Sequence, residues 1–137
     1  MDKAKTIAVN VVVTAIIAII LIWGNSWYRQ WSQFNRGEAA LAKGDFVAAI
    51  AGYEAAIHMY TPGSPLVERT AEKLWGIAEE REENGDRQLA LVAYRALRSS
   101  FYSTWGLTRP GTWWIARCDA KIAQLVKLQG EAGAQKS

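Results

Sequence analysis

An uncharged apolar run near the N-terminus is the feature that most limits what this chain can fold into. Residues 6–23 read TIAVNVVVTAIIAIILIW, and these 18 positions carry no charged side chain. As an α-helix the run is about 27 Å long, which is sufficient to cross the hydrocarbon core of a bilayer. Its many β-branched residues disfavour a helix in water, but in hydrocarbon the backbone must satisfy its own hydrogen bonds. We therefore expect a transmembrane helix that contacts the lipid bilayer over residues 6–23.

Aromatic residues follow the apolar run, as is typical of the belt at a lipid–water interface. The membrane-interface aromatics that we predict are Trp23, Trp27, Tyr28 and Trp31. A cleavable signal peptide is the competing interpretation, since Lys3 and Lys5 precede the run. Bulky Ile22 and Trp23 stand where cleavage would fall, so we expect the segment to be retained as an anchor.

The charges on either side of the anchor favour one orientation. Lys3 and Lys5 precede it, whereas the basic residues that follow it are diluted by Glu38 and Asp45. Basic residues next to an uncleaved apolar helix tend to stay in the cytoplasm. We therefore expect a single-pass protein of the bacterial inner (plasma) membrane, with a cytoplasmic N-terminus and a periplasmic helical domain.

One side of the apolar helix carries polar and small residues at helical spacing. The transmembrane helix-packing face that we predict consists of Asn10, Thr14, Ala18 and Leu21. Small and hydrogen-bonding side chains aligned in this way let a second helix approach closely. The face therefore predicts an integral-membrane protein partner. The alternative is that Asn10, one turn inside the membrane, reaches interfacial water.

The rest of the chain has the size of one small domain, since about 110 residues remain after the anchor. The 16 Lys and Arg residues are interleaved with 13 Asp and Glu residues, so the net charge of +3 gives no basis for nucleic-acid binding. The single cysteine, Cys118, excludes an intrachain disulfide and a cysteine-cluster zinc site. We expect an N-terminal tail and transmembrane anchor (1–26), a helical domain (27–130) and a flexible tail (131–137).

Two copies of one turn signal divide the helical domain. Gly44-Asp45 and Gly85-Asp86 each combine a glycine that suits the end of one helix with an aspartate that suits the N-cap of the next. The two copies are 41 residues apart. Each therefore predicts a tight turn between antiparallel helices.

Further signals mark the third and the last helix. Residues 61–65 read TPGSP, in which Ser64 suits an N-cap and Pro65 the first helical position. Pro110 opens the last helix, which we expect to end near Gly130. Apolar residues recur at helical spacing in every segment. The buried stripes that we expect are Phe46, Ala49, Ile50, Tyr53, Ile57 and Tyr60; Val67, Ala71, Leu74, Trp75 and Ala78; Leu89, Ala90, Ala93, Tyr94, Leu97 and Phe101; and Ile115, Cys118, Ile122 and Leu125.

The residues around the two turn signals resemble the tetratricopeptide repeat (TPR) consensus. The matching residues are Gly37, Gly44, Asp45, Phe46, Ala49, Tyr53 and Ala56, and then Gly85, Asp86, Ala90 and Tyr94. The chain departs from the consensus at Gln33 and Ala40, where a large residue and a tyrosine are usual, and its 41-residue period is longer than the usual 34 or so. The resemblance implies an all-α, TPR-like α-hairpin domain of about five helices, in which the last helix caps two divergent repeats.

The chain has no motif typical of catalysis, because nucleophile signatures, glycine-rich phosphate loops and metal-ligand spacings are missing from the sequence. His58 lies one turn from Glu54, where an ordinary surface pair is expected. Four glutamates at 79, 80, 82 and 83 are interpreted as a solvated helix end, relieved by Arg81 and Arg87, with docking of a basic partner as the alternative. We expect no enzyme, no cofactor, no bound metal, no nucleic acid and no small-molecule substrate.

Aromatic and basic residues gather before and within the last helix. Trp and Tyr combine a large apolar area with a polar group and are favoured at interfaces. We expect either Trp113 or Trp114 to point inward. The candidate partner surface that we predict consists of Trp105, Trp113, Arg109 and Arg117.

Anchor and hairpins together predict a non-enzymatic membrane-anchored scaffold or adaptor, which mediates protein–protein interaction in the assembly or stabilisation of a membrane complex. The alternative is an accessory single-pass subunit of a respiratory, transport or proton-channel complex, packed through its transmembrane helix. The whole chain also resembles small single-pass TPR-like proteins of bacteria, some of which accompany proton-channel proteins of the TolQ/ExbB type. An enzyme with an unrecognised site would require a deep polar pocket around His58 or the glutamate cluster.

Overall fold

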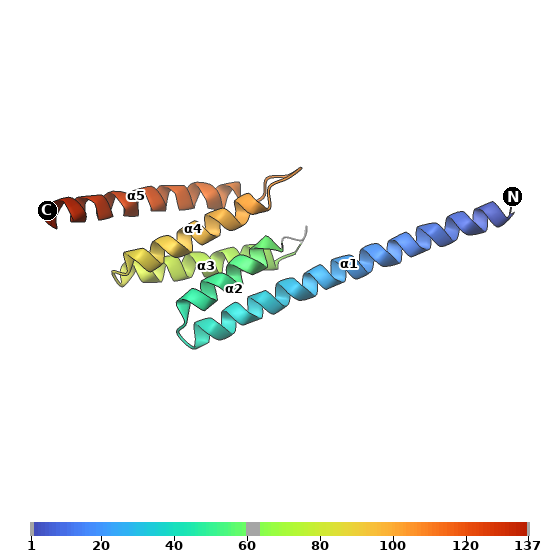
Figure 1. Cartoon of the computed structure of the whole chain (residues 1–137), viewed down its shortest axis with the longest axis horizontal. Helices are drawn as coiled ribbons and strands as arrows, with labels where there is room; N and C mark the ends of the chain where they lie inside the picture. Colours follow the sequence, from blue (N-terminus) through green and yellow to red (C-terminus); the bar gives the residue numbers. More distant parts are fainter. Residues whose placement is uncertain (1, 60–63, 137) are drawn as a thin grey trace.

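The chain folds into five α-helices, as a computed structural model that describes residues 2–59 and 64–136 shows. The helices are α1 (Asp2–Ala42), α2 (Phe46–His58), α3 (Leu66–Glu83), α4 (Arg87–Ser103) and α5 (Thr112–Lys136). In Figure 1, α2 to α5 and the C-terminal part of α1 lie side by side as a stack of antiparallel helices, and the N-terminal half of α1 extends away from it. The prediction of an all-helical chain, with a long apolar helix at its N-terminus, is confirmed.

α1 runs without a break from the apolar segment into the first hairpin. From the sequence, Gly24 and Ser26 would permit a bend in the chain after the apolar segment, yet both lie within the 41-residue helix. The expected boundary between residues 26 and 27 therefore falls inside α1. Since a helix of this length is about 60 Å long and bends only gently, α1 sets the position of the stack relative to the apolar half.

The two Gly-Asp turns have the predicted conformations. Gly44 and Gly85 adopt positive φ angles of 76° and 82°, which glycine tolerates best because it has no Cβ atom. A side-chain oxygen of Asp45 and one of Asp86 each accept a hydrogen bond from the backbone N–H three residues later, at 3.1 Å and 3.2 Å. Both aspartates therefore cap the helix that follows, as predicted.

The other helix ends differ from the predictions by one or more residues. α3 begins at Leu66, although Pro65 already has helical dihedral angles and Ser64 Oγ accepts a hydrogen bond from Leu66 N at 3.3 Å. α5 begins at Thr112, two residues after Pro110. Tyr60 and residues 61–63 of the predicted break lie outside the described residues.

The prediction that the last helix ends near Gly130 is wrong. α5 continues through Gly130 to Lys136 and includes most of the expected tail at 131–137. A glycine ends a helix when it adopts a left-handed conformation, and Gly130 does not have a positive φ angle. Its cost inside a helix is about 1 kcal/mol relative to alanine, and good helix formers such as Leu128 and Glu131 flank it.

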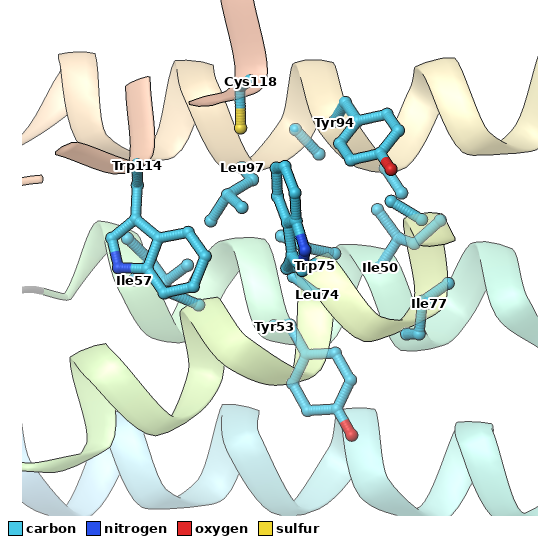
Figure 2. Packing of buried hydrophobic residues seen from close by; sticks show 14 of the residues in the cluster. Ile50, Tyr53, Ile57, Leu74, Trp75, Ile77, Tyr94, Leu97, Trp114 and Cys118 are labelled. Atoms are coloured by element: carbon cyan, nitrogen blue, oxygen red, sulfur yellow. The ribbon is translucent and has the colours of Figure 1, made fainter. Parts of the chain in front are cut away.

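The core lies between the helices of the stack, and the predicted stripes supply it. All the stripe residues that the structure describes are buried except Phe46 and Leu89, which are partly buried and pack against the core. Figure 2 shows Trp75 between Tyr94 and Trp114, with ring centroids 4.9 Å and 5.9 Å away. Trp114 is the inward member of the tryptophan pair, because it is 4% exposed whereas Trp113 is 59% exposed.

α1 and α2 approach each other most closely at two glycines. A Cβ atom on Gly52 would lie 2.7 Å from the backbone nitrogen of Gly37, and one on Gly37 would lie 2.9 Å from the Tyr53 ring. Such distances are too short for real contacts. The pair therefore lets the two backbones pack at a separation that larger residues would not allow.

We expect Gly52→Ala to destabilise the stack, because the new methyl group forces two backbones apart. Overpacking of this kind costs about 1–3 kcal/mol, which exceeds the ~1 kcal/mol that alanine gains over glycine in a helix. Urea unfolding of the full chain in mild detergent, followed by circular dichroism, measures the change. Gly76→Ala in α3 is the matched control, since nothing lies within 4 Å of its Cβ position, and it should stabilise the chain. Equal shifts for the two variants would contradict this account of the close approach.

Candidate functional site

The N-terminal half of α1 is an unburied apolar rod. Its most apolar 18-residue window has a mean hydropathy of 2.6 and is 0% buried within the structure. Ile7, Ile19 and Leu21 are each about 60% or more exposed. By length and composition this helix is able to cross a membrane.

The predicted helix-packing face forms a shallow hollow on this rod. Asn10, Thr14 and Ala18 line it together with Val11 and Ala15. Leu21, predicted on the same face, is 67% exposed and is not part of the lining. Small side chains next to larger neighbours produce such a hollow, into which a second helix fits.

The hollow and the stack lie on roughly opposite sides of α1. At about 100° per residue, Thr14 is turned by about 160° around the helix axis from Phe34, which is buried against α2. A helix packed on the hollow would therefore not collide with the stack.

The predicted interface aromatics mark the stretch where α1 leaves the stack. Trp23 and Trp27 lie on the side of α1 that continues the buried positions Gln30 and Phe34. Trp31 packs edge-on against Phe34, with ring centroids 6.0 Å apart, and is 38% exposed. Tyr28 is 75% exposed. At about 100° per residue, the three tryptophans therefore share one side of α1, and Tyr28 lies at the edge of the same half of the helix surface.

Gln30 fastens α1 to two other helices at this point. Its side chain is fully buried, and its Nε2 donates a hydrogen bond to the Ala56 carbonyl oxygen of α2 at 3.1 Å. Its Oε1 accepts one from Ser64 Oγ, immediately before α3, at 2.7 Å. A buried amide with both ends satisfied fixes the geometry of three elements where the stack ends.

A tyrosine and a lysine join the first three helices to one carboxylate. The Tyr53 hydroxyl donates a hydrogen bond to Glu38 Oε1 at 2.7 Å, and Figure 2 shows it pointing toward the ribbon of α1. Lys73 Nζ of α3 lies 3.5 Å from the same oxygen. The carboxylate of α1 therefore contacts both α2 and α3.

The same arrangement recurs in the last three helices. The Tyr94 hydroxyl of α4 donates to Glu82 Oε2 of α3 at 2.8 Å, and Lys121 Nζ of α5 lies 3.3 Å from that oxygen. Burial raises the pKa of Tyr53 and of Tyr94 well above the ordinary value, and the neighbouring carboxylates raise it further. Both hydroxyl groups therefore remain neutral hydrogen-bond donors.

The glutamates at the end of α3 have partners within the fold. Besides Glu82, Glu79 accepts a hydrogen bond from Trp75 Nε1 at 2.6 Å and Glu80 pairs with Arg81 at 3.2 Å. Arg81 also stacks over the Phe46 ring, 4.1 Å from its centroid. Much of the cluster is therefore hydrogen-bonded or ion-paired within the fold rather than only solvated. Its negative charge is offset by Lys121 as well as by Arg81.

The predicted pair of His58 with Glu54 is present, with Nε2 and Oε1 3.8 Å apart. Both side chains are more than one third exposed, so the pair is an ordinary surface contact. Among the residues that the structure describes, no group of three or more His, Cys, Asp or Glu side chains is arranged to hold a metal ion.

A cleft opens between the last turn of α1 and α3. Its lining combines apolar, basic and acidic residues. They are Leu41, Arg69, Glu72, Lys73, Gly76, Ile77 and Glu80. Glycine at 76 leaves the floor open, since nothing lies within 4 Å of its Cβ position. The cleft has a floor of apolar atoms and charges of both signs, which suits a peptide segment better than a single small ion.

The four residues of the predicted partner surface form two stacked pairs. The Arg109 guanidinium lies over the Trp105 ring at 5.3 Å, and both belong to the connection between α4 and α5. The Arg117 guanidinium contacts the rings of Trp75 and Trp113, with its central carbon 4.2 Å and 4.4 Å from their centroids. Arg117 is therefore committed to intramolecular cation–π contacts, while Trp113 and Arg109 remain exposed.

Sequence reasoning missed Gln30 and both tyrosine–glutamate pairs. Gln30 has a weak signal, because it precedes Phe34 by one helical turn on the stripe that becomes buried. Tyr53 and Tyr94 share the 41-residue offset of the turns, but Glu38 and Glu82 are 44 residues apart, so the repeat does not identify the acceptors.

No family model, curated protein or solved structure among those compared with the chain matches it.

We expect Gln30→Leu to loosen the junction of α1, α2 and α3, because it leaves Ser64 and the Ala56 carbonyl without their partner. Loss of a buried hydrogen-bond partner costs about 1–3 kcal/mol. Amide hydrogen exchange in detergent should show faster exchange in the last turn of α2 and the first turn of α3. Gln88→Leu on the exposed face of α4 is the control. Unchanged exchange at the junction would show that Gln30 does not fasten it.

We expect Cys118 to be unreactive in the folded chain. It is fully buried, and burial raises its pKa from 9.0 to about 12. The unfolded thiol ionises first, so this group's contribution to stability is complete below pH 9.0 and is lost as the pH rises toward 12. Mass spectrometry should detect alkylation by iodoacetamide only after denaturation. Cys118→Ala should lack this part of the pH dependence, and rapid alkylation of the native chain would contradict the prediction.

Proposed function

We propose that this chain is a non-enzymatic, membrane-anchored adaptor with a TPR-like helical stack. In this proposal residues 6–23 span the inner membrane of a bacterium, the N-terminus is cytoplasmic and the stack is periplasmic. The observation that carries it is α1, one unbroken helix whose apolar half is unburied and whose other half is built into the stack. Such a helix holds a protein-binding module at a fixed place next to the bilayer.

Repetition within the stack supports the TPR-like part of the proposal. Phe34 contacts Tyr53 at 5.7 Å, and Trp75 contacts Tyr94 at 4.9 Å, both between ring centroids. Each pair joins the two helices of one hairpin, and the second pair follows the first by 41 residues. Stacked hairpins of this kind bury a continuous core and leave helix faces free for a partner.

The cleft between α1 and α3 is the part of the stack that we assign to the partner. Its apolar floor at Leu41, Gly76 and Ile77 offers contact area, and Arg69 and Glu72 at its walls offer charges that select among peptides. A segment of another protein bound here would complete the packing of α3 against α1.

A second candidate function is that of an accessory subunit of a respiratory, transport or proton-channel complex, the last of the TolQ/ExbB type. The hollow at Asn10, Thr14 and Ala18 favours it, because it faces away from the stack and is open to a partner helix. Contacts of this kind contribute about 1 kcal/mol each, so several along the face are needed for a stable complex.

Pull-down of the tagged chain from its native membrane in mild detergent tests both functions. For the adaptor we expect Gly76→Tyr, which fills the cleft, to abolish co-purification of a partner. Ala51→Tyr, at an exposed position of α2, is the matched control and should retain it. Mass spectrometry identifies the partner and its stoichiometry.

For the subunit function, we expect changes in the hollow of α1, rather than in the cleft, to release the partner. There, Asn10→Leu/Thr14→Leu should release the partner, whereas Val12→Leu/Ile16→Leu on the other side of α1 should not. Recovery of the chain alone in every case would contradict a stable complex of either kind.

A further inference from the structure

The connection between α4 and α5, residues 104–111, projects exposed side chains from the end of the stack. We call five residues of this connection and of the adjoining helix ends the loop apex: Tyr102, Leu107, Arg109 and Trp113, which are exposed, and Trp105, which is partly buried. Leu107 at its tip is fully exposed, and Trp113 is 59% exposed. An apolar tip flanked by aromatic and basic groups is unusual on a surface that meets only water.

The loop holds this shape through its own hydrogen bonds. Trp105 Nε1 donates to the Pro110 carbonyl oxygen at 3.0 Å, and Gly106 N donates to the Thr108 carbonyl oxygen at 3.0 Å. Leu107 therefore lies at the tip of a closed turn. Leu107 does not fold back onto the core, although Phe101, six residues earlier, belongs to it.

The topology brings the loop apex to the membrane side of the stack. Because the helices alternate in direction, the α4–α5 connection lies at the end of the stack from which the apolar half of α1 emerges. In Figure 1 the connection points in the same direction as the N-terminus of α1 and lies about level with the stretch where α1 leaves the stack. That stretch carries the predicted belt from Trp23 to Trp31.

We propose that the loop apex is a second membrane contact, which inserts into the headgroup region of the same bilayer that α1 crosses. Leu107 and Trp113 would enter the interface, and Arg109 would meet lipid phosphate groups. This inference rests on the membrane span proposed above and goes beyond it, because a single-pass anchor needs no second contact.

The charge around the loop favours anionic lipid. From Ser99 to Cys118 the sequence contains two arginines, Arg109 and Arg117, and no aspartate or glutamate. Glu68 of α3 is exposed near the start of α5, and its Oε1 accepts a hydrogen bond from Trp114 Nε1 at 2.9 Å, so part of this carboxylate is engaged within the stack. Tryptophan, tyrosine and arginine are also the residues that anchor proteins at lipid–water interfaces.

A fluorescent label next to the tip reports this contact. The full-length Thr108→Cys chain, labelled with nitrobenzoxadiazole, is reconstituted into phosphatidylcholine vesicles with or without phosphatidylglycerol. Cys118 is buried and leaves the new thiol as the labelled group. We expect blue-shifted emission that lipids spin-labelled near the headgroup quench. The same label on Gln88→Cys, at the opposite end of α4, should show neither effect.

Two further changes separate the apolar and the charged contributions. Leu107→Asp should abolish the quenching, whereas Val92→Asp at an exposed position of α4 should not. Arg109→Glu should lower the equilibrium constant for seating the loop in the interface, taken from the quenched fraction of label 108, about fivefold per charge changed in anionic vesicles and much less in neutral ones. Equal, unquenched emission from labels 108 and 88 in a chain that resists alkaline carbonate extraction would overturn the loop contact while leaving the span intact. Loss of the chain on carbonate extraction would overturn the span and the loop contact together.

Discussion

The close packing of α1 against α2 at Gly37 and Gly52 is the contact on which the rest of the architecture depends. The N-terminal half of α1 is an exposed apolar helix, and its C-terminal half packs against the other helices through this contact. No larger residue fits at Gly52 unless a backbone moves. At the other end of the same interface, Gln30 donates a hydrogen bond to the Ala56 carbonyl oxygen of α2 and accepts a second one from Ser64, which precedes α3. The stack is therefore fastened to α1 at two places more than one helical turn apart, so it has little freedom to swing about the rod.

The two sides of α1 divide the candidate contacts of the molecule. One side carries Trp23 and Trp27 and continues into the positions that are buried against α2. These two tryptophans therefore lie on the same side of α1 as the stack. The other side carries the hollow at Asn10 and Thr14. A helix bound at the hollow would therefore not compete with the stack for the same face of α1.

Much of this fold is predictable from the sequence because its signals are local. Gly44 and Asp45 act through backbone conformation and one capping bond, and the apolar stripes act through helical spacing alone. The contacts that fix the helices relative to each other are not local. Glu38 and Tyr53 are 15 residues apart and Trp114 and Glu68 are 46 apart, and nothing in the spacing selects these partners.

The continuity of α1 was also open, because Gly24 is tolerated within a helix but equally permits a bend. Of the four residues predicted as a partner surface, Arg117 illustrates the limit, since the sequence cannot reveal that its guanidinium already contacts the rings of Trp75 and Trp113.

The stiffness of α1 also sets the distance between the two sites that we assign to partners. The hollow is centred near Thr14 and the cleft begins at Leu41, so the helix separates them by about 40 Å. A partner that occupied both sites would need a helix in the membrane and a segment well above its surface.

With α1 alone as anchor, the stack would still be free to rotate about the membrane normal and to tilt. A loop apex seated in the headgroup region would remove the tilt, because two contacts on one rigid body define its angle to the bilayer. The cleft would then be held at a constant height above the membrane, which is the property that an adaptor for a membrane complex requires.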